Sequence, residues 1–309
     1  IGINYNLSIY DTVHKMRPQK PVFASECCAT GTTRDWNFDA DTNGRIRDKD
    51  RDANDWFLGR EKTYKSLRER SYVFGCYQWA AVEHRGEAAW PRVCSCSGAL
   101  DLFLQKKGAF YQNKSHWTKE PMAHIVPHWN FKGLEGKEIL VTVYTNCEES
   151  ELFLNGESLG KQQIEKYGHG EWNVKYTPGT LEVKGYIGGK EVCSDKRVTT
   201  GKPVALRLTR DNDFTANGSD IALFTCECVD ENGRVVPDAA EYVSFSVSAP
   251  ARIIGTGSDN CDHNNVANTS RKMYMGKIRV AVKLQKGQKG FTLTAMNDNC
   301  GICKIDIIL

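Results

Sequence analysis

The chain has 309 residues, of which 40% are hydrophobic and 26% are charged, so it is long enough for two or three domains with ordinary hydrophobic cores. Its 41 basic and 38 acidic side chains leave a formal net charge of +3, which is too balanced for a nucleic-acid-binding surface. No apolar stretch is long enough to span a membrane, and the first ten residues lack the basic start and apolar core of a signal peptide. Nucleic-acid and membrane partners are therefore not expected.

Residues 1–118 alternate short apolar runs with helix-like segments. The runs predict strands over Gly2–Asn6, Val22–Ser25 and Val73–Trp79, and the segments Asp55–Ser71 and Asp101–Ser115 predict helices. Such alternation is typical of a parallel sheet with crossover helices. Three parallel strands cannot close a barrel or bury both faces, so the pattern predicts either a small open sheet or the last part of a larger barrel.

Glu26 is the most informative residue of this region, because it ends the apolar run that begins at Pro21 and precedes the small, polar stretch Cys27–Arg34. A carboxylate at the end of a buried strand does not fill a core. In a parallel α/β barrel, catalytic side chains collect at the carboxyl ends of the strands. The alternative is a solvated carboxylate in a loop.

The run Asp48–Asp55 imitates the start of a calcium-binding EF-hand loop. The sixth position is Ala53 instead of glycine and the twelfth is Gly59 instead of glutamate, so no calcium site is expected. The run predicts a solvated approach of mixed charge to the following helix.

After residue 118 the pattern is entirely β. Short strands separated by turns predict one β-sandwich, with Asn155-Gly156 as a strong hairpin signal. A second sandwich begins near Val204, and Gly201–Pro203 is a plausible linker. The predicted domains are therefore 1–118, 119–201 and 202–309.

The 12 cysteines are scattered along the chain, which favours a reducing, cytoplasmic location over a disulfide-rich scaffold, with a bacterial periplasm left open. Cys300 and Cys303 form the one CxxC motif, and a zinc ribbon needs a second pair. Cys226 and Cys228 lie two apart in an apolar run, which predicts small hydrophobic residues on one face of a strand. No metal and no cofactor are expected.

Several ordered motifs resemble the C-terminal part of a β-galactosidase of glycoside hydrolase family 2, and the likeness spans the whole chain. The motifs are Lys20–Glu26, Val73–Trp79 with Arg85–Glu87, Tyr111–Trp117, Pro127–Asn130, and Val143–Asn146 with Glu151–Gly156. The resemblance implies a multidomain fold of α/β and all-β parts. Residues 1–118 would be the last three βα units of a (β/α)8 barrel, followed by two immunoglobulin-like β-sandwiches.

The resemblance also implies a retaining glycosidase, in which two carboxyl groups about 5–5.5 Å apart flank the glycosidic bond. Glu26 matches the nucleophile, and Tyr5 matches a tyrosine that orients the nucleophile by a hydrogen bond. Trp79 matches an aromatic platform for the sugar. The ordinary alternatives are an aromatic residue at a strand end for Tyr5 and a packing residue for Trp79.

Three further residues follow Trp79 in a loop expected at the mouth of the barrel. Glu83, His84 and Glu87 are candidates for substrate binding there, each more peripheral than essential. Relatives often have Asp-Tyr where this chain has Glu83-His84, which puts the usual sugar contacts of that position in doubt.

The general acid/base of the family is a glutamate at the end of the fourth barrel strand, and the resemblance places that strand before Ile1. Its loss removes a contribution of about 10²–10⁴-fold, so the chain alone is expected to have no useful activity. An upstream half of the barrel, covalent or as a separate chain, is the expected partner, together with a β-galactoside or related oligosaccharide.

Two alternatives remain open from the sequence. β-Glucuronidases and β-mannosidases share the architecture. Galactose is favoured only because the residues of the motifs around Trp117 and Pro127–Asn130 look more like those of β-galactosidases. The second alternative is that the chain is a non-catalytic glycan-binding or scaffolding module. Trp129 and Trp172 are then the candidate aromatic residues for contact with a sugar.

Overall fold

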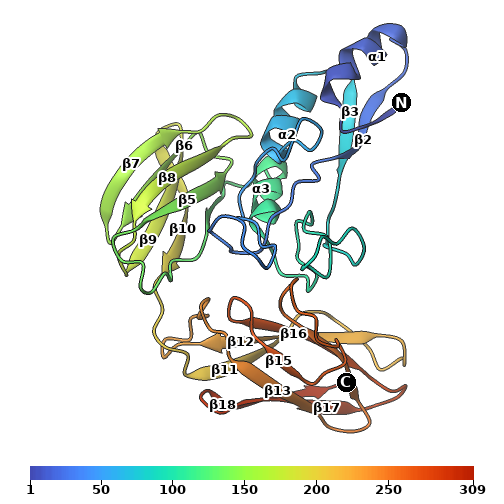
Figure 1. Cartoon of the computed structure of the whole chain (residues 1–309), viewed down its shortest axis with the longest axis vertical. Helices are drawn as coiled ribbons and strands as arrows, with labels where there is room; N and C mark the ends of the chain where they lie inside the picture. Colours follow the sequence, from blue (N-terminus) through green and yellow to red (C-terminus); the bar gives the residue numbers. More distant parts are fainter. The chain divides into compact units, whose positions relative to one another are not determined.

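The computed structural model describes residues 1–309, which form two compact units, Ile1–Val198 and Thr199–Leu309 (Figure 1). Strands predominate, and the α-helices all lie in the first unit. The predicted boundary at residue 118 falls inside the first unit, where helices give way to strands, and as a domain boundary it stays a prediction. No helix is both long and apolar enough to cross a membrane.

The first unit begins with a three-stranded parallel sheet in the order β1-β2-β3. The predicted parallel pairing is confirmed, and the helices lie between the strands in sequence. The elements of this region are β1 (Gly2–Asn4), η1 (Leu7–Ile9), α1 (Tyr10–Met16), β2 (Val22–Cys27), α2 (Arg60–Arg68), β3 (Val73–Gln78) and α3 (Gly108–Trp117). Ile3, Val22, Ala24 and Leu67 share one buried cluster, so α2 and the strands close a small core.

Asp48 and Asp50 correct the prediction that the run Asp48–Asp55 is solvated. Both side chains are buried. The Asp50 carboxylate accepts hydrogen bonds of 2.9 Å from the backbone N–H groups of Arg60 and Glu61, at the start of α2. The Asp48 carboxylate accepts one of 2.9 Å from Gly108, at the start of α3. The unpaired N–H groups of a helix start attract anions, so the two carboxylates cap two helices and are drawn inward.

The same capping shortens α2. The sequence predicts a helix over Asp55–Ser71, and the observed helix begins only at Arg60. A Cβ atom on Gly59 would lie 2.9 Å from a carboxylate oxygen of Asp50, so the cap needs glycine at this position.

The remaining strands of the first unit form two sheets, β4-β5-β8 and β10-β9-β6-β7. Their bounds are β4 (Ala123–Val126), β5 (Glu138–Thr145), β6 (Glu149–Leu154), β7 (Glu157–Gln163), β8 (His169–Lys175), β9 (Thr180–Ile187) and β10 (Lys190–Val198). Val143 and Val183, from different sheets, share one buried core with Trp129 and Trp172. The predicted Asn155-Gly156 hairpin is confirmed, because β6 pairs with β7 and both turn residues have positive φ.

A charged cluster connects α2 to β8 within this unit. Nδ1 of His169 lies 2.5 Å from Glu61, and Nε2 lies 2.8 Å from Glu171. Lys49 pairs with Glu171 at 2.6 Å. Burial alone would lower the pKa of His169, but the hydrogen bonds to Glu171 and Glu61 outweigh it and raise the pKa to about 9. Burial alone would raise the pKa of Glu171, but its hydrogen bonds with His169 and Lys49 outweigh that effect and lower the pKa to about 2.

The cluster is expected to stabilise the fold within a defined pH window. A histidine whose pKa rises on folding contributes its full stability below the unfolded value of about 6.5, and this is lost as pH rises through about 9. The lowered pKa of Glu171 sets the lower end of this pH window. The stability that its ionised carboxylate contributes is lost as pH falls from about 4.5 through 2. His169→Gln should therefore cost about 1–3 kcal/mol of unfolding free energy at pH 6.

Urea unfolding of the wild type and His169→Gln at pH 6 and pH 10 checks this. The difference between the two proteins should shrink at pH 10, because the wild type has lost the imidazolium there. An equal difference at both pH values would contradict the assignment. Val192→Ala on β10 is the control, because this exposed side chain does not titrate and its loss should leave the pH dependence unchanged.

The second unit consists of two four-stranded sheets, β11-β12-β16-β14 and β15-β13-β17-β18. The strands are β11 (Ala205–Arg210), β12 (Ile221–Val229), β13 (Tyr242–Val247), β14 (Arg252–Gly257), β15 (Ser270–Lys272), β16 (Lys277–Lys283), β17 (Gly290–Asn297) and β18 (Gly301–Ile308). Phe224 and Val280 from one sheet and Leu293 from the other share one core. Cys226 and Cys228 are buried there, which confirms their predicted role as small hydrophobic residues.

Candidate active site

Glu26 lies near the carboxyl end of β2, beside the residue that follows β1. Asn4 of β1 pairs with Glu26, so the next residue, Tyr5, reaches the same end of the sheet. The Tyr5 backbone N–H donates a 2.8 Å hydrogen bond to the carbonyl oxygen of Glu26, and Tyr5 has a φ of 57°. Positive φ is uncommon for a tyrosine and marks a residue held by its surroundings.

The Tyr5 hydroxyl donates a short hydrogen bond to Oε1 of Glu26. Burial, and then the hydrogen bond and charge of Glu26, raise the pKa of Tyr5 well above its ordinary value. The hydroxyl therefore stays protonated and remains a donor throughout the working pH range. The Phe57 ring packs edge-on against the Tyr5 ring, with the ring centres 4.9 Å apart.

Trp79 follows β3 at the third strand end. Its backbone N–H donates a 2.8 Å hydrogen bond to the carbonyl oxygen of Cys27, and its indole N–H donates one of 3.1 Å to Glu87. The His84 ring lies edge-on to the indole at 5.4 Å, and its Nε2 is 3.6 Å from Glu87. Trp79, His84 and Glu87 therefore form one group on the loop after β3.

Cys27 connects the two groups, because it follows Glu26 in β2 and its carbonyl oxygen accepts the hydrogen bond from the Trp79 backbone N–H. Tyr5, Glu26 and Trp79 thus follow or end three successive parallel strands, with His84 and Glu87 beside them. The structure brings together five of the six predicted site residues.

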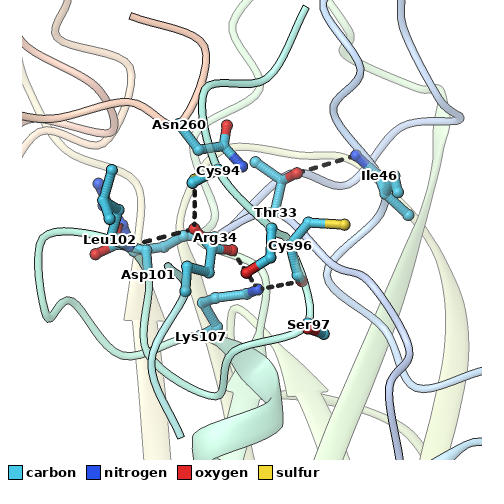
Figure 2. Close-up of polar contacts among 12 residues, drawn as sticks. Thr33, Arg34, Ile46, Cys94, Cys96, Ser97, Asp101, Leu102, Lys107 and Asn260 are labelled. Carbon is cyan, nitrogen blue, oxygen red and sulfur yellow. Dashed lines mark hydrogen bonds and ion pairs between the residues drawn. The ribbon is translucent and has the colours of Figure 1, made fainter. Parts of the chain in front are cut away.

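Glu83 is the sixth, and it lies apart from this group. Its side chain is 1% exposed, and its carboxylate pairs with Nζ of Lys107 at 2.7 Å. Lys107 is fully buried and also donates to the carbonyl oxygen of Cys96 at 2.8 Å, and Figure 2 shows it beside Cys96. Burial raises the pKa of Glu83, and the charge of Lys107 opposes that shift. This placement does not fit the predicted contact with a sugar, and it makes Glu83 an anchor for the loop that carries His84 and Glu87.

A second buried ion pair lies nearby and was not expected from the sequence. Nε of Arg34 donates to Asp101 at 2.7 Å, and both side chains are largely buried. Figure 2 draws both residues. The two residues are 67 positions apart, and no local pattern connects them.

The contact of Phe57 with Tyr5 was not predicted from the sequence either. An aromatic residue shortly before a glycine and a helix is only a weak signal for a loop that contacts an active site.

The site combines the Glu26 carboxylate, held by the Tyr5 hydroxyl, with the indole of Trp79 at the next strand end. A carboxylate held in this way can act as a nucleophile or as a base. No group of three or more His, Cys, Asp or Glu side chains is arranged to hold a metal ion. The side chains gathered at this site are two carboxylates, a phenol, an indole and an imidazole.

Residues 206–306 match the family described as glycoside hydrolase family 2 C-terminal domain 5, and residues 136–193 match a domain of unknown function, DUF4982. A β-galactosidase from Bacteroides ovatus is 34% identical over 235 residues, which cover 74% of this chain and 27% of that protein. The chain belongs to glycoside hydrolase family 2. Its residues 206–306 are therefore the family 2 C-terminal domain.

Other similar proteins carry different names. A putative β-glucuronidase from Formosa agariphila is 32% identical over 238 residues, covering 72% of this chain and 23% of that protein. A β-glycosidase structure from Bacteroides vulgatus superposes with a TM-score of 0.85 at 26% identity, covering 100% of this chain and 45% of that one. The family 2 chain spans about a quarter of the length of the curated relatives it matches.

Proposed function

We propose that this chain supplies the nucleophile half of a retaining β-glycosidase that prefers β-galactosides, with Glu26 as the nucleophile. The observation that carries the proposal is the placement of Tyr5, Glu26 and Trp79 at three successive ends of parallel strands. In a parallel barrel these ends surround the active site. The sheet β1-β2-β3 would be the last three strands of a (β/α)8 barrel, and the two following β segments would be immunoglobulin-like.

In the proposed reaction the Glu26 carboxylate attacks the anomeric carbon, and the glycosidic oxygen leaves with a proton from a separate acid. Water then hydrolyses the glycosyl-enzyme bond, with the same acid acting as base. Tyr5 holds Glu26 by its backbone N–H and by its hydroxyl, so the carboxylate is aimed before the sugar arrives. Trp79 packs against the apolar face of the sugar, and Glu87 holds the indole in place.

The acid/base would come from an upstream half of the barrel. The sheet order leaves one edge of β3 without a partner strand. Phe74 and Tyr77 on β3 are 65% and 67% exposed, and large apolar side chains on a free strand favour a covering partner. We call a protein that contains both this chain and such an upstream half the completed protein.

The sugar is the finer part of the proposal. A galactoside is supported by the β-galactosidase-like residues of the motifs around Trp117 and Pro127–Asn130, and by the name of the relative at 34% identity. A β-glucuronide is the second candidate, supported by the two Formosa agariphila relatives at 32% and 31% identity. A glycan-binding module loses its main support, because Trp129 and Trp172 are buried in a sandwich core.

Nitrophenyl β-galactoside and nitrophenyl β-glucuronide test the proposal. The 309-residue chain alone should release no nitrophenol above background, because it lacks the proposed acid. The completed protein should hydrolyse the galactoside with the higher kcat/KM. Turnover by the chain alone that disappears in Glu26→Gln would contradict the proposed division of the site, and a preference for the glucuronide would contradict the choice of sugar.

A further inference from the structure

Two cysteines far from the candidate active site bring their sulfur atoms together. Cys147 lies in the turn between β5 and β6, and Cys193 lies in β10. They are 46 positions apart in sequence, and their Sγ atoms are 3.4 Å apart, within sulfur hydrogen-bond distance. Both are thiols in this structure. A disulfide has an S–S distance of roughly 2.0 Å, so closing the bond requires a shift of little more than 1 Å.

Gly185 makes room for this pair. It lies opposite Cys193 in the pairing of β9 with β10. A Cβ atom at position 185 would lie 2.6 Å from the sulfur of Cys147 and 2.7 Å from that of Cys193. The two sulfurs therefore occupy the space that any larger side chain at position 185 would fill. The backbone of β9 accepts the pair only because this residue is glycine.

The two thiols differ in accessibility. Cys147 is buried and Cys193 is partly exposed. The hydrogen bond that Cys193 donates, outweighing burial, lowers the pKa of Cys147 to about 6, and the same bond raises the pKa of Cys193 well above its ordinary value. The pair therefore loses one proton readily and shares the other, with Cys193 on the side open to a dissolved reagent and Cys147 behind it.

We propose that Cys147 and Cys193 form a redox site that a small disulfide, such as oxidised glutathione, converts into an intramolecular disulfide. Cys193 passes its proton to the Cys147 thiolate, attacks one sulfur of oxidised glutathione, forms a mixed disulfide and releases one glutathione thiolate. Cys147 then gives up that proton, attacks the Cys193 sulfur, forms the Cys147–Cys193 bond and releases the second glutathione thiolate. The two thiol protons end on the two glutathiones, and the two electrons lost by the cysteines reduce the glutathione disulfide.

The bond would connect β10 to the β5–β6 turn across β9. It would close a loop of 46 positions within the first unit. Disulfides that close loops of this size restrict the unfolded chain. Oxidation should therefore raise the Tm of the first unit, by an amount on the order of 5–10 °C.

The test uses the folded 309-residue chain exposed to oxidised glutathione. Remaining thiols are alkylated, the chain is digested, and the peptides are mapped by mass spectrometry. We expect a peptide pair joined through Cys147 and Cys193, together with the rise in Tm. In Cys147→Ser, Cys193 should instead keep one glutathione, and the rise should be absent. In Cys193→Ser, Cys147 should stay unmodified.

Cys303→Ser is the matched control, because Cys303 is also partly exposed but lies in the second unit. This variant should keep the cross-link and the Tm rise. Full alkylation of both Cys147 and Cys193 after oxidation would overturn the proposal, as would their pairing with other cysteines. The mapping of the wild-type chain decides the question even where a serine variant fails to fold.

Discussion

Glu26→Gln is expected to lower the kcat of the completed protein for a β-galactoside by about 10⁴-fold or more. The substitution is nearly isosteric, so the fold and the Tyr5 contact can persist, but an amide does not form the glycosyl bond. Removal of a covalent nucleophile costs on this scale in other hydrolases. Steady-state turnover of nitrophenyl β-galactoside, with the Tm of each variant measured alongside, gives the result.

Two further variants give reference values for the fall in kcat of Glu26→Gln. Tyr5→Phe removes one hydrogen bond to Glu26 and should lower kcat by roughly 10–100-fold, since such a bond to a charged group contributes about 1.5–3 kcal/mol. Glu157→Gln removes an exposed carboxylate on β7 and should leave the rate unchanged. A Glu26→Gln rate within tenfold of wild type would show that Glu26 is not the nucleophile.

Lys107→Met should destabilise the chain by about 3–5 kcal/mol, the largest effect on stability that we expect from one substitution. The methionine fills a similar volume but leaves the buried Glu83 carboxylate without its cation. The pKa of Glu83 is already raised by burial, and loss of Lys107 removes the charge that opposes this shift. The folded variant therefore holds a proton more tightly than the unfolded chain, so its deficit should grow as pH rises from 5 to 8.

Denaturant unfolding at both pH values measures this deficit. The double variant Glu83→Gln with Lys107→Met should recover part of the loss, because no uncompensated charge remains. Lys62→Met is the matched control, since Lys62 pairs with Asp52 at 2.9 Å on the surface and should cost less than about 1 kcal/mol. A Lys107→Met cost as small as that of Lys62→Met would contradict the buried pair.

The residues at the strand ends could be predicted from the sequence. Short apolar runs identify the strands, and the carboxyl ends of parallel strands lie at one edge of a sheet. Glu26 could be assigned to a strand end in this way, and the resemblance to family 2 placed Tyr5 and Trp79 at the neighbouring ends. The pairing of β1, β2 and β3 agrees with this placement. The barrel itself and the roles of these residues remain proposals.

Contacts between distant polar residues could not be predicted in the same way. Glu83 seemed to belong with its neighbours His84 and Glu87, but a lysine 24 positions later draws it into the interior. Asp48 and Asp50 looked solvated because the run is highly charged, yet two helix starts bind them. In each case the deciding partner lies outside the local window, and hydropathy alone gives no sign of it.

The anchoring of the loop after β3 has a consequence for which of its residues can vary. Glu83 anchors the loop through its buried ion pair with Lys107. The side chains of His84 and Glu87, in contrast, are 37% and 62% exposed. Substitutions at exposed positions usually change stability by less than about 0.5 kcal/mol. Residue 84 can therefore vary at little cost in stability, whereas a change at residue 87 would remove the hydrogen bond that holds the Trp79 indole. Substitutions in this loop should accumulate at position 84 before they reach position 87.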